Sequence, residues 1–258
     1  MFRPLVLALL CGFAHAAPPP FEDSMAQRTL ACVACHGREG RAGPDGYYPR
    51  IAGKPQGYLY NQLLNFRDGR RHYGLMAGLL DPLSDRYLSE IAGHFAQLQV
   101  PYPPPQPANL PVEAMERGRV LATQGDAGQR IPACASCHGK AFMGTEPAVP
   151  GLLGLPRDYL NAQLGAWRTG QRRAHAPDCM GEIARRLAPD DVLAVTGWLS
   201  SQAVSAQARV AAAASNARRP AAARAGPKSR RTLAQAPPAP PAPPMQCGTA
   251  PLPARAPA

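Results

Sequence analysis

Two copies of the pattern Cys-x-x-Cys-His supply the side chains with the clearest potential for chemistry. They are Cys32, Cys35 and His36 in the first copy, and Cys134, Cys137 and His138 in the second. In an exported chain this spacing predicts covalent haem attachment, in which two thiols form thioethers with the haem vinyl groups and the imidazole binds the iron. A zinc site would need further Cys or His in each copy, and a thioredoxin-like dithiol would need a βαβ pattern. Neither is present.

A second ligand for each iron is predicted at Met76 and Met180. Met76 lies 40 residues after His36, Met180 lies 42 residues after His138, and these methionines coincide when the two halves of the sequence are aligned. A thioether sulfur is a soft ligand that suits haem iron, and ligation by His and Met raises the reduction potential. A core-filling methionine is the alternative interpretation.

Other side chains are expected to surround the two haem groups. Pro49 follows His36 by 13 residues and Pro150 follows His138 by 12, so a backbone carbonyl could accept a hydrogen bond from each imidazole and fix its ring. A plain turn proline is the alternative. Candidate donors to the haem propionates, for which packing or solvent-facing roles remain open, are Tyr58, Tyr159, Arg67, Arg168, Trp167, Arg71 and Arg172.

The elements that position these residues form an internal repeat. "CVACHG" returns as "CASCHG" at an offset of 102, and "PRIAGKPQGYLYNQLLNFRDGRR" returns as "PGLLGLPRDYLNAQLGAWRTGQR" at an offset of 101. So many matches with such small drift indicate a duplicated domain. The predicted division is domain 1 over residues 17–99, a Pro-rich linker over 100–111 and domain 2 over 112–202.

Each copy has the periodicity of helices and lacks the alternation of strands, so the predicted fold class is all-α. Middle helices are expected over 58–67 and 159–168, each closed by a glycine, and helices are expected ahead of each Cys motif around 24–31 and 112–123. Ser84 is a predicted N-cap and Pro189 a predicted helix start. The last helix of the first copy is marked by apolar residues at Leu88, Ile91, Ala92, Phe95 and Leu98.

Charge is distributed unevenly along the 258 residues. The net charge is +11, from 28 Lys plus Arg against 17 Asp plus Glu. Eight of the basic residues lie in 201–258, which has no acidic residue, and Arg3 is a ninth, so residues 17–200 have a net charge of only +2. The folded part is nearly neutral, which does not favour binding of nucleic acid.

The two ends of the chain differ from its middle. Residues 1–16 combine an early Arg, a short apolar run and Ala14-His15-Ala16, which predicts a secretory signal peptide and export to the periplasm. Residues 203–258 are rich in Ala, Pro and Arg, and we expect a disordered tail. Peripheral contact of this basic tail with a membrane or an acidic partner is one interpretation, and a solvated tail without a partner is the other.

Two of the seven cysteines, Cys179 and Cys247, belong neither to the haem motifs nor to the predicted signal peptide. They could form a disulfide that ties the tail to domain 2, or they could remain free. Cys179 adjoins Met180, and a thiolate ligand at this place would lower the potential and change the chemistry.

From about Ala26 to Leu199 the chain resembles the dihaem cytochromes c4 and, more loosely, the class I cytochromes c. The resemblance rests on both Cys-x-x-Cys-His segments, the repeated "PRIAGKPQGYLYNQLLNFRDGRR" region and the methionine ahead of "LSDRYLSEIAGHFAQL". It implies two tandem cytochrome c-like domains related by a pseudo-twofold axis, each around one covalently attached haem c, with the propionates near the interface. The implied iron ligands are His36 with Met76 and His138 with Met180.

The resemblance implies a periplasmic carrier of single electrons rather than an enzyme. Its partners would be redox proteins: a quinol-oxidising complex or a dehydrogenase as donor, and a terminal oxidase as acceptor. One alternative is a dihaem enzyme, such as a thiosulfate dehydrogenase or a peroxidase, with Cys179 or an open position at the second iron. Another is the cytochrome subunit of a periplasmic dehydrogenase.

Overall fold

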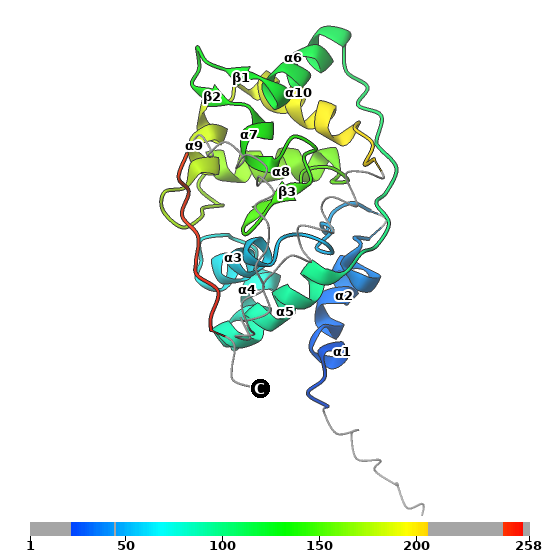
Figure 1. The fold of residues 1–258 in the computed structure, drawn as a ribbon, viewed down its shortest axis with the longest axis vertical. Helices are drawn as coiled ribbons and strands as arrows, with labels where there is room; N and C mark the ends of the chain where they lie inside the picture. Colours follow the sequence, from blue (N-terminus) through cyan, green and yellow to red (C-terminus); the bar gives the residue numbers. More distant parts are fainter. Residues whose placement is uncertain (1–21, 44, 206–244, 255–258) are drawn as a thin grey trace, which may run out of the picture.

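The computed structural model describes residues 22–43, 45–205 and 245–254, in which two groups of helices lie one above the other (Figure 1). The predicted all-α class is confirmed, with two-residue strands as the only additions in these ranges. No helix of the described part is both long enough and apolar enough to cross a membrane. The predicted signal peptide and residues 206–244 of the predicted tail lie outside the described residues.

Domain 1 packs its helices around a core whose main contributors are α3 and α5. Its elements are α1 (Met25–Arg28), α2 (Leu30–His36), a 3₁₀ turn η1 (Arg38–Gly40), α3 (Gln56–Arg67), α4 (Gly74–Leu80) and α5 (Asp85–Gln97). As predicted, the Ser84 hydroxyl caps α5 by accepting a hydrogen bond from the Tyr87 amide. The apolar stripe of α5 places Leu88, Ile91 and Phe95 in the core, where each is less than 5% exposed.

Domain 2 repeats this plan with an added pair of short hairpins. Its elements are α6 (Val112–Thr123), β1 (Gly125–Asp126), β2 (Ile131–Pro132), α7 (Cys134–His138), β3 (Gly144–Thr145), β4 (Val149–Pro150), α8 (Arg157–Arg168), α9 (Cys179–Arg186) and α10 (Pro189–Ser200). β1 pairs with β2 and β3 with β4, both antiparallel. Gly118 lets α6 approach α10 closely, because a Cβ there would lie 2.2 Å from the Ala194 carbonyl oxygen.

The middle helices α3 and α8 end alike and lead directly to the domain interface. Gly69 and Gly170 follow them in the left-handed region, with φ of 70° and 76°, which confirms the predicted glycine stops. Immediately afterwards, Arg71 and Arg172 form an antiparallel bridge. The bridge is flanked by hydrogen bonds from the His72 amide to the Gln171 carbonyl and from the Arg173 amide to the Arg70 carbonyl. Repeat-related segments therefore meet across the pseudo-twofold axis.

The Pro-rich linker follows the body of the protein and is fixed to it by Arg50. This guanidinium donates to the carbonyls of Val100 at 2.6 Å and Pro101 at 2.8 Å, and it stacks 4.1 Å above the Tyr102 ring. Arg50 is only 2% exposed. A buried guanidinium needs such acceptors, because burial without them has a high free-energy cost.

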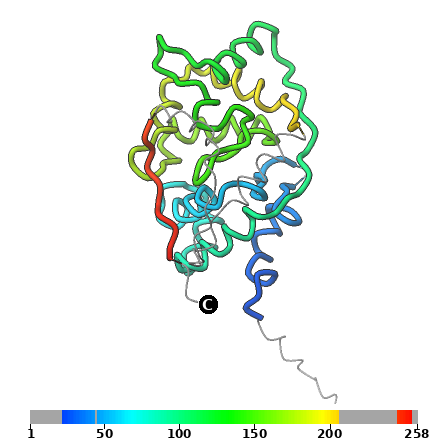
Figure 2. Tube along the Cα trace, viewed as in Figure 1, coloured from blue at the N-terminus to red at the C-terminus, as the bar shows by residue number. Residues whose placement is uncertain are grey.

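Residues 245–254, here called the C-terminal strap, contradict the prediction of a tail disordered throughout 203–258. The strap runs along one side of the molecule from α9 in domain 2 to the helices of domain 1 (Figure 2). Cys247 forms a disulfide with Cys179, so of the two interpretations of these cysteines the paired one is observed. The tail is anchored at a place where composition alone indicates no structure.

The strap contacts both domains. On domain 2, the Gly248 amide donates to the Pro177 carbonyl at 3.0 Å. On domain 1, the Asn61 amide group donates to the Thr249 hydroxyl at 2.6 Å and accepts from the Ala250 amide at 2.9 Å, while Leu252 packs against the core. The strap therefore joins the two domains independently of the linker.

Removing the disulfide by Cys247→Ser should lower the free energy of unfolding by about 2–4 kcal/mol, because a closed loop restricts the unfolded chain. The measurement is thermal unfolding of the oxidised holoprotein, followed by circular dichroism. A thiol reductant should lower the melting temperature of the wild type to that of the variant and leave the variant unchanged. Equal sensitivity of both proteins to the reductant would show that the disulfide contributes nothing.

The Asn61→Ala variant separates the strap's contact with domain 1 from its disulfide. The equivalent residue of the second repeat is Ala162, so alanine is compatible with this helix position. Loss of the two hydrogen bonds should cost about 1–3 kcal/mol while leaving the disulfide intact.

Candidate haem sites

One continuous cavity of about 1210 Å³ runs through both domains. Its lining includes the cysteines and histidines of both Cys-x-x-Cys-His motifs together with Met76 and Met180. The sequence predicted these eight residues as two groups of four, and the structure brings both groups to one internal space. The remainder of the lining is mainly apolar, as a site for a large planar macrocycle requires.

Each proximal histidine is held by the proline carbonyl predicted for it. The Nδ1 atom of His36 lies 2.8 Å from the Pro49 carbonyl oxygen, and that of His138 lies 2.7 Å from the Pro150 carbonyl oxygen. A carbonyl accepts only from N–H, so each bond leaves Nε2 as the unprotonated nitrogen that can bind a metal. Burial lowers the pKa of both imidazoles, which keeps them neutral as metal ligation demands.

The cysteines of the motifs do not have the properties of a redox dithiol. Burial raises the pKa of the Cys134 thiol to about 11 and also raises that of Cys32. Dithiol oxidoreductases depend on the opposite shift, to a low pKa that produces a reactive thiolate. One such thiol in each motif, at the wall of an apolar cavity, fits covalent attachment of a cofactor.

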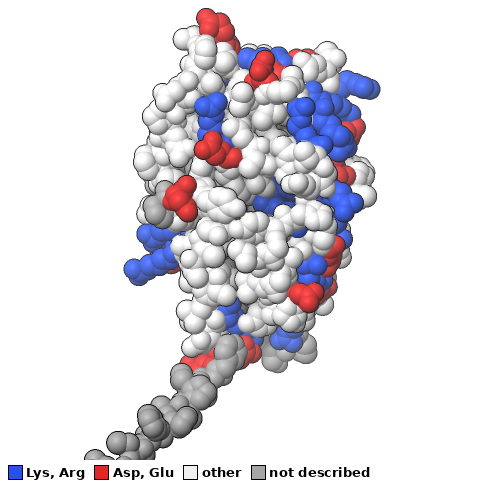
Figure 3. Space-filling model, turned by 180° about the vertical axis from the view of Figure 1, so that it is seen from behind, with Lys and Arg blue, Asp and Glu red and all other residues white. Residues whose placement is uncertain are grey.

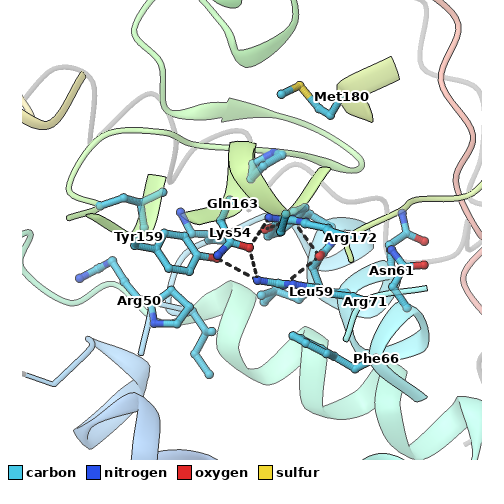
Figure 4. A pocket seen from close by; sticks show the side chains of 18 of the residues that line it. Arg50, Lys54, Leu59, Asn61, Phe66, Arg71, Tyr159, Gln163, Arg172 and Met180 are labelled. Atoms are coloured by element: carbon cyan, nitrogen blue, oxygen red, sulfur yellow. Dashed lines mark hydrogen bonds between the residues drawn. The ribbon is translucent and has the colours of Figure 1, made fainter. Parts of the chain in front are cut away.

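The centre of the cavity is crossed by a symmetric network of repeat-related residues (Figure 4). Arg71 of domain 1 donates to Gln163 of domain 2 at 2.7 Å, and Arg172 of domain 2 donates to Gln62 of domain 1 at 2.9 Å. Each arginine also donates to the glutamine of its own domain, Arg71 at 3.0 Å and Arg172 at 2.7 Å. The two domains thus exchange equivalent hydrogen bonds, which defines the pseudo-twofold relation at atomic detail.

The tyrosines predicted near the propionates belong to the same network. Tyr159 accepts from Arg71 at 3.3 Å and Tyr58 accepts from Arg172 at 3.4 Å. Burial by itself raises the pKa of Tyr159, but the two arginines outweigh it and lower the pKa below its usual value. This region of the cavity therefore has a strongly positive potential.

Buried groups near this network lack the partners that haem propionates would provide. Lys54 is 6% exposed, and burial, followed by the charge of Arg50, lowers its pKa to about 7. Trp167 has a buried indole N–H without a hydrogen-bond partner among the described residues. Buried donors and cations without a counter-charge are costly, and carboxylates at this place would satisfy them. The residues present therefore fit a haem with its propionates at the domain interface.

Arg67 and Arg168 correct the predicted set of propionate donors. Neither side chain lines the cavity. Instead, Arg67 donates to the carbonyl of Leu83 and Arg168 donates to that of Leu187, which is the equivalent residue of the second repeat. Each arginine extends from the last turn of its middle helix toward the start of the last helix, so it holds these two helices together and lies outside the cavity lining.

The disulfide lies next to the predicted ligand Met180. Cys179 is 6% exposed and, with Cys247, lines the cavity beside that methionine. Leu75, which precedes Met76 at the equivalent place in domain 1, is 69% exposed. The two methionine segments therefore differ in that only the second is covered by the strap.

Lys54, Gln62, Gln163 and Asn61 were not predicted from the sequence as members of the site. The glutamines carried a signal, because they are identical in the two repeats at an offset of 101. Lys54 and Asn61 carried none, since their counterparts are Leu155 and Ala162.

No protein-family model matches the chain. Curated relatives do. A thiosulfate dehydrogenase electron acceptor of Thiomonas intermedia is 35% identical over 206 residues, which cover 80% of this chain and 93% of that protein. Cytochrome c4 of Pseudomonas aeruginosa is 34% identical over 200 residues, which cover 76% of this chain and 94% of that protein.

Solved structures give the same result. A thiosulfate dehydrogenase from Marichromatium purpuratum matches with a TM-score of 0.61 and 31% identity over 69% of this chain. The match spans 40% of the length of that protein. Cytochrome c4 from Pseudomonas stutzeri matches with a TM-score of 0.60 and 29% identity, over 69% of this chain and 96% of that protein.

Three observations point to the same family: the cavity, the two Cys-x-x-Cys-His motifs that line it, and the match over nearly the whole length of the cytochromes c4. The family binds two covalently attached haem c groups and transfers electrons with redox partners. The chain belongs to the cytochrome c4 family and is a dihaem c-type cytochrome that transfers electrons.

Proposed function

We propose that this cytochrome is a periplasmic carrier that receives single electrons from a thiosulfate dehydrogenase and passes them to a terminal oxidase. The name of the Thiomonas relative supports this donor, because that protein is an electron acceptor of such an enzyme. The terminal oxidase is the acceptor implied by the cytochrome c4 resemblance. Export to the periplasm rests on the signal peptide predicted over residues 1–16.

The observation that carries the proposal is the presence of one histidine and one methionine for each iron. His36 and Met76 line the domain 1 part of the cavity, and His138 and Met180 line the domain 2 part. If these residues ligate the two irons, no position would remain at which a substrate could bind iron, and the protein would supply only potential and docking.

The disulfide supports a carrier over an enzyme at the second haem. The Cys179 sulfur is bonded to Cys247 and is therefore not a thiolate available to the iron. This weakens the alternative of a thiosulfate-oxidising enzyme with cysteine ligation. The alternative of a cytochrome subunit within a dehydrogenase assembly shares the same chemistry and differs in the permanence of the contact.

Stopped-flow absorbance tests the proposal directly. The oxidised cytochrome is mixed with catalytic amounts of a purified thiosulfate dehydrogenase and with thiosulfate, and haem reduction is followed. We expect reduction at least about tenfold faster than with a quinol-oxidising complex and quinol at matched concentrations. Electrons should then pass to a terminal oxidase with uptake of oxygen.

Thiosulfate without the dehydrogenase is the essential control. With thiosulfate alone the cytochrome should stay oxidised. It should also form no tetrathionate when an artificial electron acceptor is added. Turnover of thiosulfate by the cytochrome alone would replace the carrier with an enzyme. Reduction by the quinol-oxidising complex at the higher rate would refute the proposed donor while leaving the carrier role intact.

A further inference from the structure

Lys54 is a buried cation that belongs to domain 1 by sequence and contacts domain 2. Its ammonium group donates a hydrogen bond of 3.0 Å to the Gly151 carbonyl oxygen. Gly151 directly follows Pro150, whose carbonyl holds the Nδ1–H of His138. The ammonium group of Lys54 therefore lies next to the backbone segment that holds His138, the predicted iron ligand of the other domain. Its charge contributes to lowering the pKa of the His138 imidazole, after the larger effect of burial.

The surroundings of Lys54 leave its charge without compensation by protein carboxylates. None of the ion pairs between described residues involves Lys54. The neighbouring cation Arg50 is occupied by the linker carbonyls and the Tyr102 ring, whereas Lys54 faces the cavity (Figure 4). Solvent also screens it little, since the residue is 6% exposed.

This cation breaks the symmetry of the two repeats. The counterpart of Lys54 is Leu155, which is 7% exposed and belongs to the apolar core of domain 2. Arg71 and Arg172, in contrast, are matched and exchange equivalent hydrogen bonds between the domains. Two sites with the same predicted ligands can differ in potential only through their surroundings, and Lys54 is such a difference.

We propose that Lys54 raises the reduction potential of the haem bound at His138 relative to that of the haem bound at His36. Reduction removes one positive charge from an iron centre, so a nearby cation stabilises the reduced form. The sign is the same if Lys54 also pairs with a propionate, because that pairing cancels a negative charge that would stabilise the oxidised form. A single electron on the protein then resides mainly in domain 2.

The test is a redox titration of full-length holoprotein carrying Lys54→Leu, the residue of the second repeat, at pH 6, where Lys54 is mainly protonated because this pH lies below its pKa of about 7. Proton NMR signals of the two haem groups, assigned through their contacts with His36 and His138, report each site separately. In the half-reduced protein we expect the ratio of electrons on the domain 2 haem to electrons on the domain 1 haem to fall about tenfold. This corresponds to a fall of about 59 mV at the domain 2 haem. The potential of the domain 1 haem should shift by less than the equivalent of about a threefold change in this ratio.

Three further variants make the result specific. Lys54→Met removes the charge with little change of shape and should reproduce the effect, while Lys54→Arg keeps the charge and should not. Lys140→Met removes a positive charge two residues after His138 at an exposed position, where water screens it, and should have almost no effect. Haem content and circular dichroism verify that each variant is folded.

An unchanged distribution in Lys54→Leu and Lys54→Met would overturn the inference. So would a fall confined to the domain 1 haem, or an equal fall in Lys54→Arg. These measurements use the isolated cytochrome, so their outcome is independent of whether a thiosulfate dehydrogenase is its donor.

Discussion

Replacing Cys134 and Cys137 together by alanine should leave one covalently bound haem per chain instead of two. Both thiols line the domain 2 part of the cavity, and they are the groups through which attachment is predicted. Domain 2 should also lose its cooperative unfolding, because without haem its helices surround a void where packed atoms are needed. Haem content after denaturing electrophoresis and a pyridine haemochrome assay measure the first effect, and circular dichroism measures the second.

Ser136→Ala is the matched control, because this residue lies between the two cysteines of the same motif. Its hydroxyl donates to the Ala133 carbonyl, so some local stability is lost but both haem groups should remain. The reciprocal double variant at Cys32 and Cys35 should remove the other haem. Two haem groups retained in either double variant after denaturation would contradict covalent attachment at these cysteines.

Met180→Ala should convert the second haem from a low-spin to a high-spin centre that binds carbon monoxide and cyanide rapidly. The alanine methyl cannot replace the thioether, so the iron loses one ligand. The potential of that haem should fall by about 0.1 V or more, within the roughly 0.8 V over which axial ligands set haem potentials. Visible spectra in both redox states and a potentiometric titration provide the measurements.

Met143→Ala is the control for loss of a methionine from the same domain. Met143 packs against the domain 2 core and has no methionine counterpart in domain 1. This variant should lose some stability and keep two low-spin haem groups. A low-spin, carbon monoxide-resistant second haem in Met180→Ala would refute ligation by this methionine.

The duplicated sequence made most of the site predictable. Residues with the same role at each haem appear twice at a nearly constant offset, so His36 with His138 and Met76 with Met180 could be paired without knowledge of the fold. The same signal identified Pro49 and Pro150, whose carbonyls accept the imidazole hydrogen bonds. Helix starts and stops were predictable because caps and terminal glycines are local features.

The repeat could not show which way a matched side chain points. Arg67 and Arg168 are identical in both copies because they bind the carbonyls of Leu83 and Leu187, not because they reach the haem. Conversely, Lys54 is unmatched and was missed, since its role depends on a contact between domains. Contacts between residues distant in sequence leave no periodic pattern.

The strap was predicted only in part: pairing of Cys179 with Cys247 was one of two interpretations, but the ordered contact with domain 1 was not expected. Its composition of Pro, Ala, Gly and Thr offers little apolar surface, which ordinarily indicates disorder. Order comes instead from one covalent bond to Cys179 and from Asn61, the latter more than 180 residues away in the chain. The composition of the segment alone therefore does not predict that the strap is ordered.

Pairing of Cys179 with Cys247 has a consequence for the maturation of the protein. Four thiols must remain reduced until haem is attached, while two others in the same chain must be oxidised. Cys247 follows both haem motifs in chain order, so Cys179 stays a free thiol in the same chain as the motif cysteines until Cys247 is available to pair with it. An oxidant acting before haem delivery would divert those cysteines into wrong disulfides. Correct assembly therefore requires that the four motif cysteines are thiols when haem is attached, although the same chain must also form the Cys179–Cys247 disulfide.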